Sequence, residues 1–262
     1  MPTKPSQPAR KRPQADDLNP ATSVAKALSL LDCFRRQDEP MGVTELARRT
    51  GLPKSTAFRL LSHLEEMGYV ERHGKQYRPG WLLFELGTGF DAVRGLRGAA
   101  LPHMADLFAL TRQSVHLGAL QQDEIIHVAR IRGHTSARSP IRYGGRAPAT
   151  CSAMGKVLLA HRPGAEITEL LGAPLPKLTR YSITVPAVLL DQLQQARERG
   201  YALEQEETGI GLVSVAVPIS YNGRDVAAVA LAGKAESFKP QAHIEALRRT
   251  SALITQSLAA LR

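Results

Sequence analysis

The sequence predicts an α+β protein with two domains, an N-terminal winged helix-turn-helix and a C-terminal α/β domain built on an antiparallel sheet. Residues 43–62 have the pattern of a helix-turn-helix, and residues 69–78 follow at once with the alternation of a β-hairpin. From residue 114 onward, strand-like alternation around tight turns is mixed with helical patterns, as in the α+β class. A chain of 262 residues is also long for one domain, which favours two.

The helix-turn-helix prediction depends on several positional requirements that are met together. Leu46 and Ala47 give the first helix an apolar face, with a small residue where the second helix comes close. Gly51 stands where the turn requires a positive φ, and Pro53 opens the next helix, where a missing N–H costs nothing. The apolar positions that close this core are Leu52, Ala57, Leu60, Leu61 and Leu64. The alternative interpretation is an ordinary helical hairpin with a polar outer face.

Polar and basic side chains remain on the outside of this motif and on the hairpin after it. Hydroxyl and cationic groups at the start of a recognition helix suit phosphates and base edges, and cations on a wing can reach the DNA backbone. The candidate DNA-contacting residues are Thr44, Lys54, Ser55, Thr56, Arg59, His63, Arg72 and Lys75. Arg78 adds a further cation to the predicted wing.

Two further segments complete the small domain. Residues 69–72 and 75–78 are expected to pair around a turn at His73 and Gly74. Residues 23–36 are expected to form the third helix that the domain needs to bury a core. Its predicted apolar face comprises Val24, Ala27, Leu28, Leu31 and Phe34.

Composition sets limits on the function. No apolar run reaches the roughly 18–20 residues that cross a bilayer, and the polar, proline-rich residues 1–19 are expected to be a disordered tail. Cys33 and Cys151 belong to no paired motif, which favours a reduced cytoplasmic protein without disulfides or zinc. The net charge of +10 suits a nucleic-acid partner, but the basic residues are spread over both halves, so the motif carries the DNA-binding prediction.

The rest of the chain supplies a linker and the second domain. Residues 81–93 are expected to form a helix that leaves the wing, and residues 96–111 a second helix. Strands are expected at 114–120 and 124–132 around Gln122 and Asp123, and at 212–220 and 225–232 around Asn222 and Gly223. The Val- and Ala-rich content of the last two predicts a sheet covered on both faces. Further helices are expected at 152–161, 165–171, 187–200 and from 241.

The order of these motifs resembles the IclR-type transcriptional regulators over residues 20–255. The carriers are GVTELARRTGLPKSTAFRLLSHLEEMGYVER, YRPGWLLFELG, GGRAPATCSAMGKVLLA, RERGYALEQEETGIG and VAVPISYNGRDVAAVALAG. The resemblance implies a winged helix-turn-helix domain (20–80), a linker helix (81–95) and a GAF-like effector-binding domain (96–262). It also implies a homodimer or dimer of dimers on double-stranded promoter DNA, without a membrane partner.

A narrower resemblance concerns the effector, a small organic acid in this family. The run Pro148-Ala149-Thr150-Cys151 is similar to the branch that senses protocatechuate, p-hydroxybenzoate and related aromatic acids. Two serines of members that bind small keto acids correspond to Ala230 and Ala232, which makes the cavity more apolar and favours a ring. By this resemblance the effector-binding residues are Thr150, Cys151, Ser152, Ala153, Met154, Glu204, Ser214, Ala230 and Ala232. Ser152 is also a natural helix N-cap, a purely structural role.

Five arginines fall within 17 residues that contain no acidic side chain, namely Arg130, Arg132, Arg138, Arg142 and Arg146. One of them could pair with a carboxylate ligand; alternatively they are solvated or pair with Glu206 and Glu207. The sequence does not choose between these interpretations.

Enzymatic interpretations have little support. Gly209-Ile210-Gly211 lacks the third glycine of a dinucleotide fingerprint. Gly155-Lys156 is not a phosphate loop, because Thr150 stands where that motif needs a glycine. No pattern in the sequence pairs Cys151 with a histidine that could act as its base. No cofactor, metal ligand set or catalytic residue is therefore expected. The alternative function is a DNA-binding regulator whose C-terminal domain serves only oligomerisation or partner binding, without a small-molecule ligand.

Overall fold

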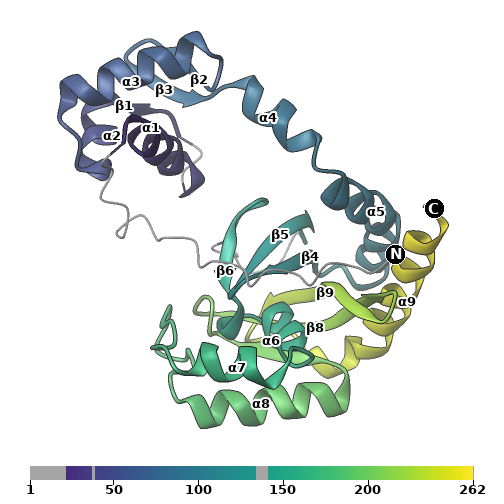
Figure 1. The fold of residues 1–262 in the computed structure, drawn as a ribbon. Helices are drawn as coiled ribbons and strands as arrows, with labels where there is room; N and C mark the ends of the chain where they lie inside the picture. Colours follow the sequence, from purple (N-terminus) through teal and green to yellow (C-terminus); the bar gives the residue numbers. More distant parts are fainter. Residues whose placement is uncertain (1–21, 37–38, 134–140, 262) are drawn as a thin grey trace, which may run out of the picture. The chain divides into compact units, whose positions relative to one another are not determined.

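The computed structural model describes residues 22–36, 39–133 and 141–261 of the chain. The chain divides into two compact units, residues 1–91 and 92–262, and each is described by itself (Figure 1). The predicted tail at 1–19 and Arg138 lie outside the described residues. No helix in the described part is long and apolar enough to cross a membrane.

The first unit is a winged helix-turn-helix. Its helices are α1 (Ser23–Asp32), α2 (Val43–Thr50), α3 (Lys54–Glu66) and α4 (Trp81–Thr88), with a 3-10 turn η1 (Cys33–Arg36) after α1. Strands β1 (Met41–Gly42), β2 (Val70–His73) and β3 (Gln76–Pro79) form a small antiparallel sheet in the order β1-β3-β2. Gly51 ends α2 with a φ of 67°, and Pro53 directly precedes α3, so the predicted turn chemistry is confirmed.

Two details of this unit differ from the prediction. Val24 and Leu28 of α1 are exposed, whereas Leu30 is fully buried. The buried row is therefore Ala27, Leu30 and Leu31 of α1, continued by Phe34 of η1, because this row faces α2 and α3. The wing turn also lies one residue later than predicted, since His73 pairs with Gln76 and Gly74 has a φ of 62°.

The linker region differs as well. The helix predicted at residues 81–93 ends at Thr88, and α5 (Asp91–Thr111) begins five residues earlier than the predicted start at 96. Gly87 and Gly89 weaken the end of α4, and Asp91 in the first turn of α5 favours a new helix start. The helical segment is therefore interrupted at Gly89 and Phe90, which separate α4 from α5.

The second unit is a six-stranded antiparallel sheet with helices on both faces (Figure 1). The strand order is β6-β5-β4-β9-β8-β7. The strands are β4 (Ser114–Gln121), β5 (Glu124–Ile131), β6 (Arg146–Pro148), β7 (Ala202–Gln205), β8 (Leu212–Tyr221) and β9 (Arg224–Lys234). The helices are α5, α6 (Ala153–Leu159), α7 (Gly164–Leu171), α8 (Pro186–Arg199) and α9 (Ile244–Ala260), with 3-10 turns η2 (Ala149–Cys151) and η3 (Pro240–His243).

Two hydrophobic cores lie on opposite faces of this sheet. Val229 and Leu231 of β9 pack into the core under α5 and α9. Ala228 and Ala230 of the same strand pack into the core under α6 and α8. The prediction of a sheet covered on both faces is thus confirmed, and the small alanines mark the side of α6.

The two predicted hairpins of this unit are present. Gln122 adopts a φ of 59° between β4 and β5, and Asn222 and Gly223 adopt φ values of 52° and 72° between β8 and β9. The short strands β6 and β7 were not predicted. Both are edge strands of three or four residues, too short for a clear alternation in the sequence.

Candidate DNA-binding face and effector cavity

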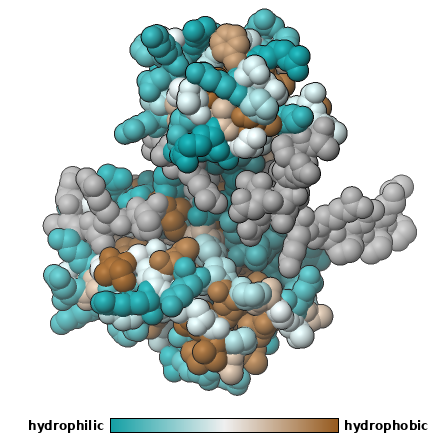
Figure 2. All heavy atoms as spheres, turned by 90° about the vertical axis from the view of Figure 1, so that its left-hand side faces the viewer, coloured by the Kyte–Doolittle hydropathy of each residue, from teal (hydrophilic) through white to brown (hydrophobic). Residues whose placement is uncertain are grey.

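The predicted DNA-contacting side chains of α3 lie on its outer side. Lys54, Ser55, Arg59 and His63 are exposed, and Thr56 is half-buried. Within the described part of the chain, neither Lys54 nor Arg59 forms an ion pair, so both cations are free for a polyanion. The side of this unit that carries α2 is largely hydrophilic in Figure 2.

The remaining predicted contacts lie on α2 and on the wing. Thr44 is exposed in the first turn of α2, and Lys75 is exposed in the wing turn. Arg72 is exposed too, and its Nε donates to the Gly74 carbonyl at 3.0 Å. Arg78, in contrast, is paired with Glu71 at 2.8 Å. Arg72 and Lys75 are therefore the more available cations of the wing.

Sequence reasoning missed Phe58, whose side chain is 47% exposed on α3 between Thr56 and Arg59. Among the described residues, Phe58 is not part of the hydrophobic core of its own domain. Its signal was present in the sequence, since Phe58 follows the buried Ala57 and falls outside the helical row of core residues. An apolar group on a recognition helix can contact a thymine methyl group.

A narrow cavity of about 30 Å³ lies between the sheet and the start of α6. It brings together seven of the nine residues that the resemblance assigned to the effector. They are Ser152, Ala153 and Met154 of the α6 start, Glu204 of β7, Ser214 of β8, and Ala230 and Ala232 of β9. Lining residues that were not predicted are His116, His127, Ile141, Thr208 and Leu212.

Thr150 and Cys151 do not line this cavity. Both lie in the 3-10 turn η2, which directs the Cys151 thiol to the Pro176 carbonyl at 3.4 Å. The Thr150 hydroxyl lies 3.9 Å from the Cys151 sulfur. Burial raises the pKa of the Cys151 thiol, which keeps it a protonated, unreactive group.

The start of α6 is held by two local features. The Ser152 hydroxyl accepts a hydrogen bond from the Gly155 N–H at 2.9 Å, so the expected N-cap is confirmed. A Cβ on Gly155 would lie 2.0 Å from the Ala149 carbonyl oxygen, so only glycine lets α6 approach η2 this closely. These two features position Ala153 and Met154 over the sheet.

Glu204 forms the polar wall of the cavity at the β7–β8 end. One carboxylate oxygen accepts from the Thr208 N–H at 3.1 Å and from its hydroxyl at 2.9 Å. The other accepts from Ser214, its cross-strand partner, at 2.9 Å. Burial raises the pKa of Glu204 above its ordinary value, against these hydrogen bonds.

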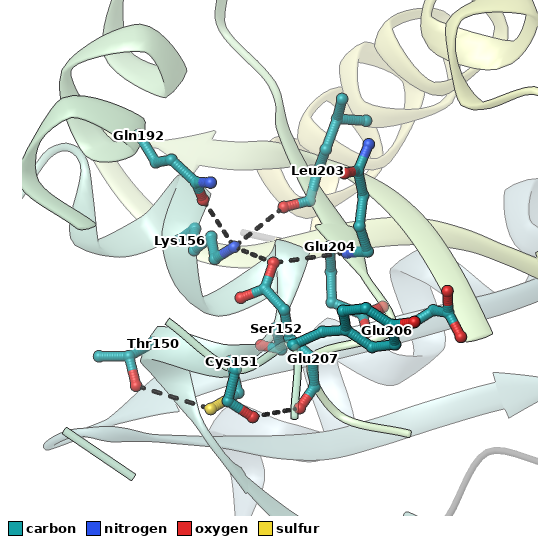
Figure 3. A network of polar contacts seen from close by, with 12 residues as sticks. Thr150, Cys151, Ser152, Lys156, Gln192, Leu203, Glu204, Glu206 and Glu207 are labelled. Atoms are coloured by element: carbon teal, nitrogen blue, oxygen red, sulfur yellow. Dashed lines mark hydrogen bonds and ion pairs between the residues drawn. The ribbon is translucent and has the colours of Figure 1, made fainter. Parts of the chain in front are cut away.

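Behind this wall, a buried ion pair ties α6 to the β7 region (Figure 3). The Lys156 ammonium donates to Glu207 at 2.5 Å, to Gln192 at 2.7 Å and to the Leu203 carbonyl at 3.3 Å. Glu207 therefore pairs with a lysine and with none of the four arginines of the basic segment that the structure describes. These hydrogen bonds fix the position of α6 relative to β7, the strand that carries Glu204.

The opposite end of the cavity carries two buried histidines. His116 of β4 and His127 of β5 contact each other edge to face, with ring centroids 5.5 Å apart. Both rings lie on the α6 face of the sheet, since His116 pairs with Ala230 of β9 and His127 pairs with Gly118 of β4. Burial, with the nearby Arg130 cation, lowers the pKa of His127 to about 4 and that of His116 well below its ordinary value.

The described arginines of the basic segment have different surroundings. Arg146 pairs with Glu124 at 2.9 Å. Arg130 stands opposite His116 on the neighbouring strand and donates to the Ile141 carbonyl at 3.3 Å. Among the described residues, no group of three or more His, Cys, Asp or Glu side chains is placed to hold a metal ion.

The fold and these two sites define a DNA-binding transcriptional regulator with a second, effector-binding domain. Residues 23–74 match the IclR helix-turn-helix domain, and residues 92–256 match the C-terminal domain of the bacterial transcriptional regulator IclR. The chain belongs to the IclR family, whose members are regulators and not enzymes.

Individual relatives agree with this assignment. The HTH-type transcriptional regulator KdgR of Escherichia coli is 36% identical over 221 residues, which cover 83% of this chain and 82% of that protein. An IclR homologue from Microbacterium hydrocarbonoxydans, crystallised with 4-hydroxybenzoate, has a TM-score of 0.84 at 29% identity and covers 91% of this chain and 100% of its own. The Thermotoga maritima IclR has a TM-score of 0.71 at 31% identity, covering 90% and 98%.

Proposed function

We propose that the cavity between the sheet and α6 binds a small organic acid with an aromatic body, and that this acid controls DNA binding. The observation that carries the proposal is the mixed lining of the cavity. Ala153, Ala230 and Ala232 offer an apolar slot, and the polar groups stand at its ends. This is the lining that a flat ring with polar substituents requires. The 4-hydroxybenzoate in the similar Microbacterium structure supports the same class of ligand.

Ligand entry requires the cavity to widen. Its volume of about 30 Å³ holds about two water molecules, far below the roughly 300 Å³ or more of typical ligand sites. Met154 is the side chain best suited to move, because its unbranched thioether adopts many rotamers at low cost. Widening at the α6 start is thus the conformational change that a bound acid would stabilise.

A panel of acids tests the ligand class. The native chain is mixed with 4-hydroxybenzoate, protocatechuate, gluconate, pyruvate or glyoxylate, and its melting temperature and its affinity for promoter DNA are measured. We expect an aromatic acid to raise the melting temperature and to change the DNA affinity. Stabilisation by pyruvate or gluconate without any effect of the aromatic acids would contradict the aromatic assignment.

We further propose that the DNA-bound form is a homodimer in which each α3 contacts one half-site. Trp81, Phe84, Leu86 and Phe90 are large apolar residues exposed on and after α4. Trp81 and Phe84 contact each other edge to face, so part of this surface is already ordered. A second copy of the same helix is a self-complementary partner for it. Because α4 also connects the wing to the effector domain, it is the proposed transmitting element.

The second candidate is a regulator whose C-terminal domain serves only assembly. Several apolar side chains on the segment before and within α8 are exposed and support it, namely Leu178, Tyr181, Val185, Val188 and Leu190. Figure 2 shows hydrophobic patches among hydrophilic residues on this domain. If no acid changes either the melting temperature or the DNA affinity, this candidate replaces the first.

A further inference from the structure

The two cavity histidines are buried without hydrogen bonds. His116 is 4% exposed and His127 is 5% exposed. None of their four ring nitrogens has a hydrogen-bond partner among the residues that the structure describes, and the same holds for the Nε of Arg130. The two histidines therefore leave all their ring nitrogens unused at one end of the cavity, and the neighbouring Arg130 leaves its Nε unused although it donates to the Ile141 carbonyl.

This arrangement is costly unless another molecule completes it. A buried polar group without a partner is destabilising, because its lost hydration is not replaced by a hydrogen bond. The edge-to-face contact of the two rings offsets only part of this loss. Apolar side chains of similar size would fill the same space without this cost. A packing role thus does not account for two histidines at this place.

The charges around the cavity differ between its two ends. At the β7–β8 end, Glu204 already accepts three hydrogen bonds and presents a carboxylate. At the β4–β5 end, Arg130 supplies a permanent cation beside two imidazoles that can each donate an N–H. An anionic group is repelled by the first end and attracted by the second.

We propose that His116, His127 and Arg130 form the carboxylate-recognition end of the effector cavity. This inference rests on the proposed function, since it assumes an acid effector, and it specifies which end of the cavity holds the acid group. The Glu204 end then accepts a hydroxyl from the far end of the ligand, because the carboxylate has four acceptor positions and three are in use. The ligand class is a hydroxy acid whose carboxylate and hydroxyl lie at opposite ends.

The test compares the binding of a carboxylate ligand with that of the uncharged amide of the same shape. Isothermal titration calorimetry measures 4-hydroxybenzoate and 4-hydroxybenzamide binding to the native chain and to the His116→Phe and His127→Phe variants. Gluconate is the second acid probe and separates a sugar acid from an aromatic one. His103→Phe is the matched control, because His103 is a half-buried histidine that bonds Ser257 away from the cavity.

We expect the native chain to bind one of the acids, and each cavity variant to bind that acid at least about tenfold more weakly. With 4-hydroxybenzoate the variants should also lose the preference for the acid over the amide. The control should keep native affinity. Retention of the native affinity and preference by both cavity variants overturns this inference alone. Failure of the native chain to bind any acid overturns the proposed function as well.

A measurement on the native chain does not depend on how well the variants fold. With ¹⁵N-labelled histidines, His116 and His127 should give ring signals that do not titrate between pH 5 and 8, because both have lowered pKa values. Addition of the bound acid should shift these non-titrating signals. Unshifted signals at saturating acid would overturn the inference.

Discussion

At the scale of single residues, the outer side of α3 combines two kinds of DNA contact. Lys54 stands in the first turn, where the helix N-terminus also favours a phosphate. Arg59 lies more than one turn further along, and its unpaired guanidinium can form the bidentate contact that guanine accepts. The two cations are therefore expected to differ in what they recognise.

Arg59→Ala should weaken specific DNA binding by about 1–3 kcal/mol and leave non-specific binding largely unchanged. Lys54→Ala should weaken both and lower the salt slope by about one. Titrations of operator and random duplexes at several salt concentrations measure both effects. An equal loss on both duplexes for Arg59→Ala would show that Arg59 contacts the backbone.

Phe58 is expected to read a thymine methyl group, since its ring is exposed on the same helix as Lys54 and Arg59. Phe58→Ala should lower affinity for the operator without changing the salt slope. Replacing the contacted thymine by uracil should weaken the native protein and leave the variant unaffected. Additive effects of the two changes would show that Phe58 and the methyl group do not touch.

At the scale of elements, α6 determines the shape of the effector cavity. Its first turn lies against η2 at Gly155, and its buried lysine is tied to Glu207 behind the Glu204 wall. A shift of this helix would move Ala153 and Met154 relative to the sheet. Helix α6 therefore both packs in the hydrophobic core and lines one side of the effector cavity.

Gly155→Ala should destabilise the effector domain by at least about 1–3 kcal/mol, because the added methyl group meets the Ala149 carbonyl. Gly98→Ala on α5 is the matched control. A Cβ at Gly98 meets no atom within 4 Å, so alanine should stabilise that helix by about 0.5–1 kcal/mol. Urea unfolding measures both. A stable Gly155→Ala variant would mean that η2 can move away.

At the scale of the whole molecule, acid should destabilise the effector domain through its two buried histidines. Their pKa values are lowered in the folded state, to about 4 for His127, from an ordinary value of 6.5. Between about pH 4 and pH 6.5 these histidines bind more protons in the unfolded chain than in the folded protein. The free energy of unfolding therefore falls as the pH falls. Glu204 and Glu207 have raised pKa values and contribute the opposite slope.

The His116→Phe/His127→Phe double variant isolates the histidine contribution. Urea unfolding between pH 4 and 7 should show a free energy that falls less steeply toward acid in the variant than in the native chain. Identical slopes would mean that the two imidazoles already bind protons in the folded protein.

The assembly of two copies should depend on the apolar surface of α4. Trp81→Ser with Phe84→Ser should lower the dimer fraction in sedimentation experiments, because both exposed rings would be removed. The affinity for a two-half-site operator should fall more than the affinity for a single half-site. An unchanged sedimentation profile would place the dimer contact elsewhere.

The sequence by itself determined the winged helix-turn-helix, the two hairpins with their turn residues and most of the helices. These features depend on local chemistry, such as the positive φ at Gly51 or the N-cap at Ser152. The family resemblance added Glu204, Ser214, Ala230 and Ala232, which the structure places together at the cavity. Their role in binding stays a prediction.

Only the tertiary structure decided which residues complete the cavity. His116 and His127 are 11 positions apart in the sequence, and the antiparallel pairing of β4 with β5 is what brings their rings together. The rotation of α1 that buries Leu30, and the turn that directs Cys151 away from the cavity, likewise depend on neighbouring elements. Sequence periodicity indicates which faces are apolar, but register and packing determine which side chains meet.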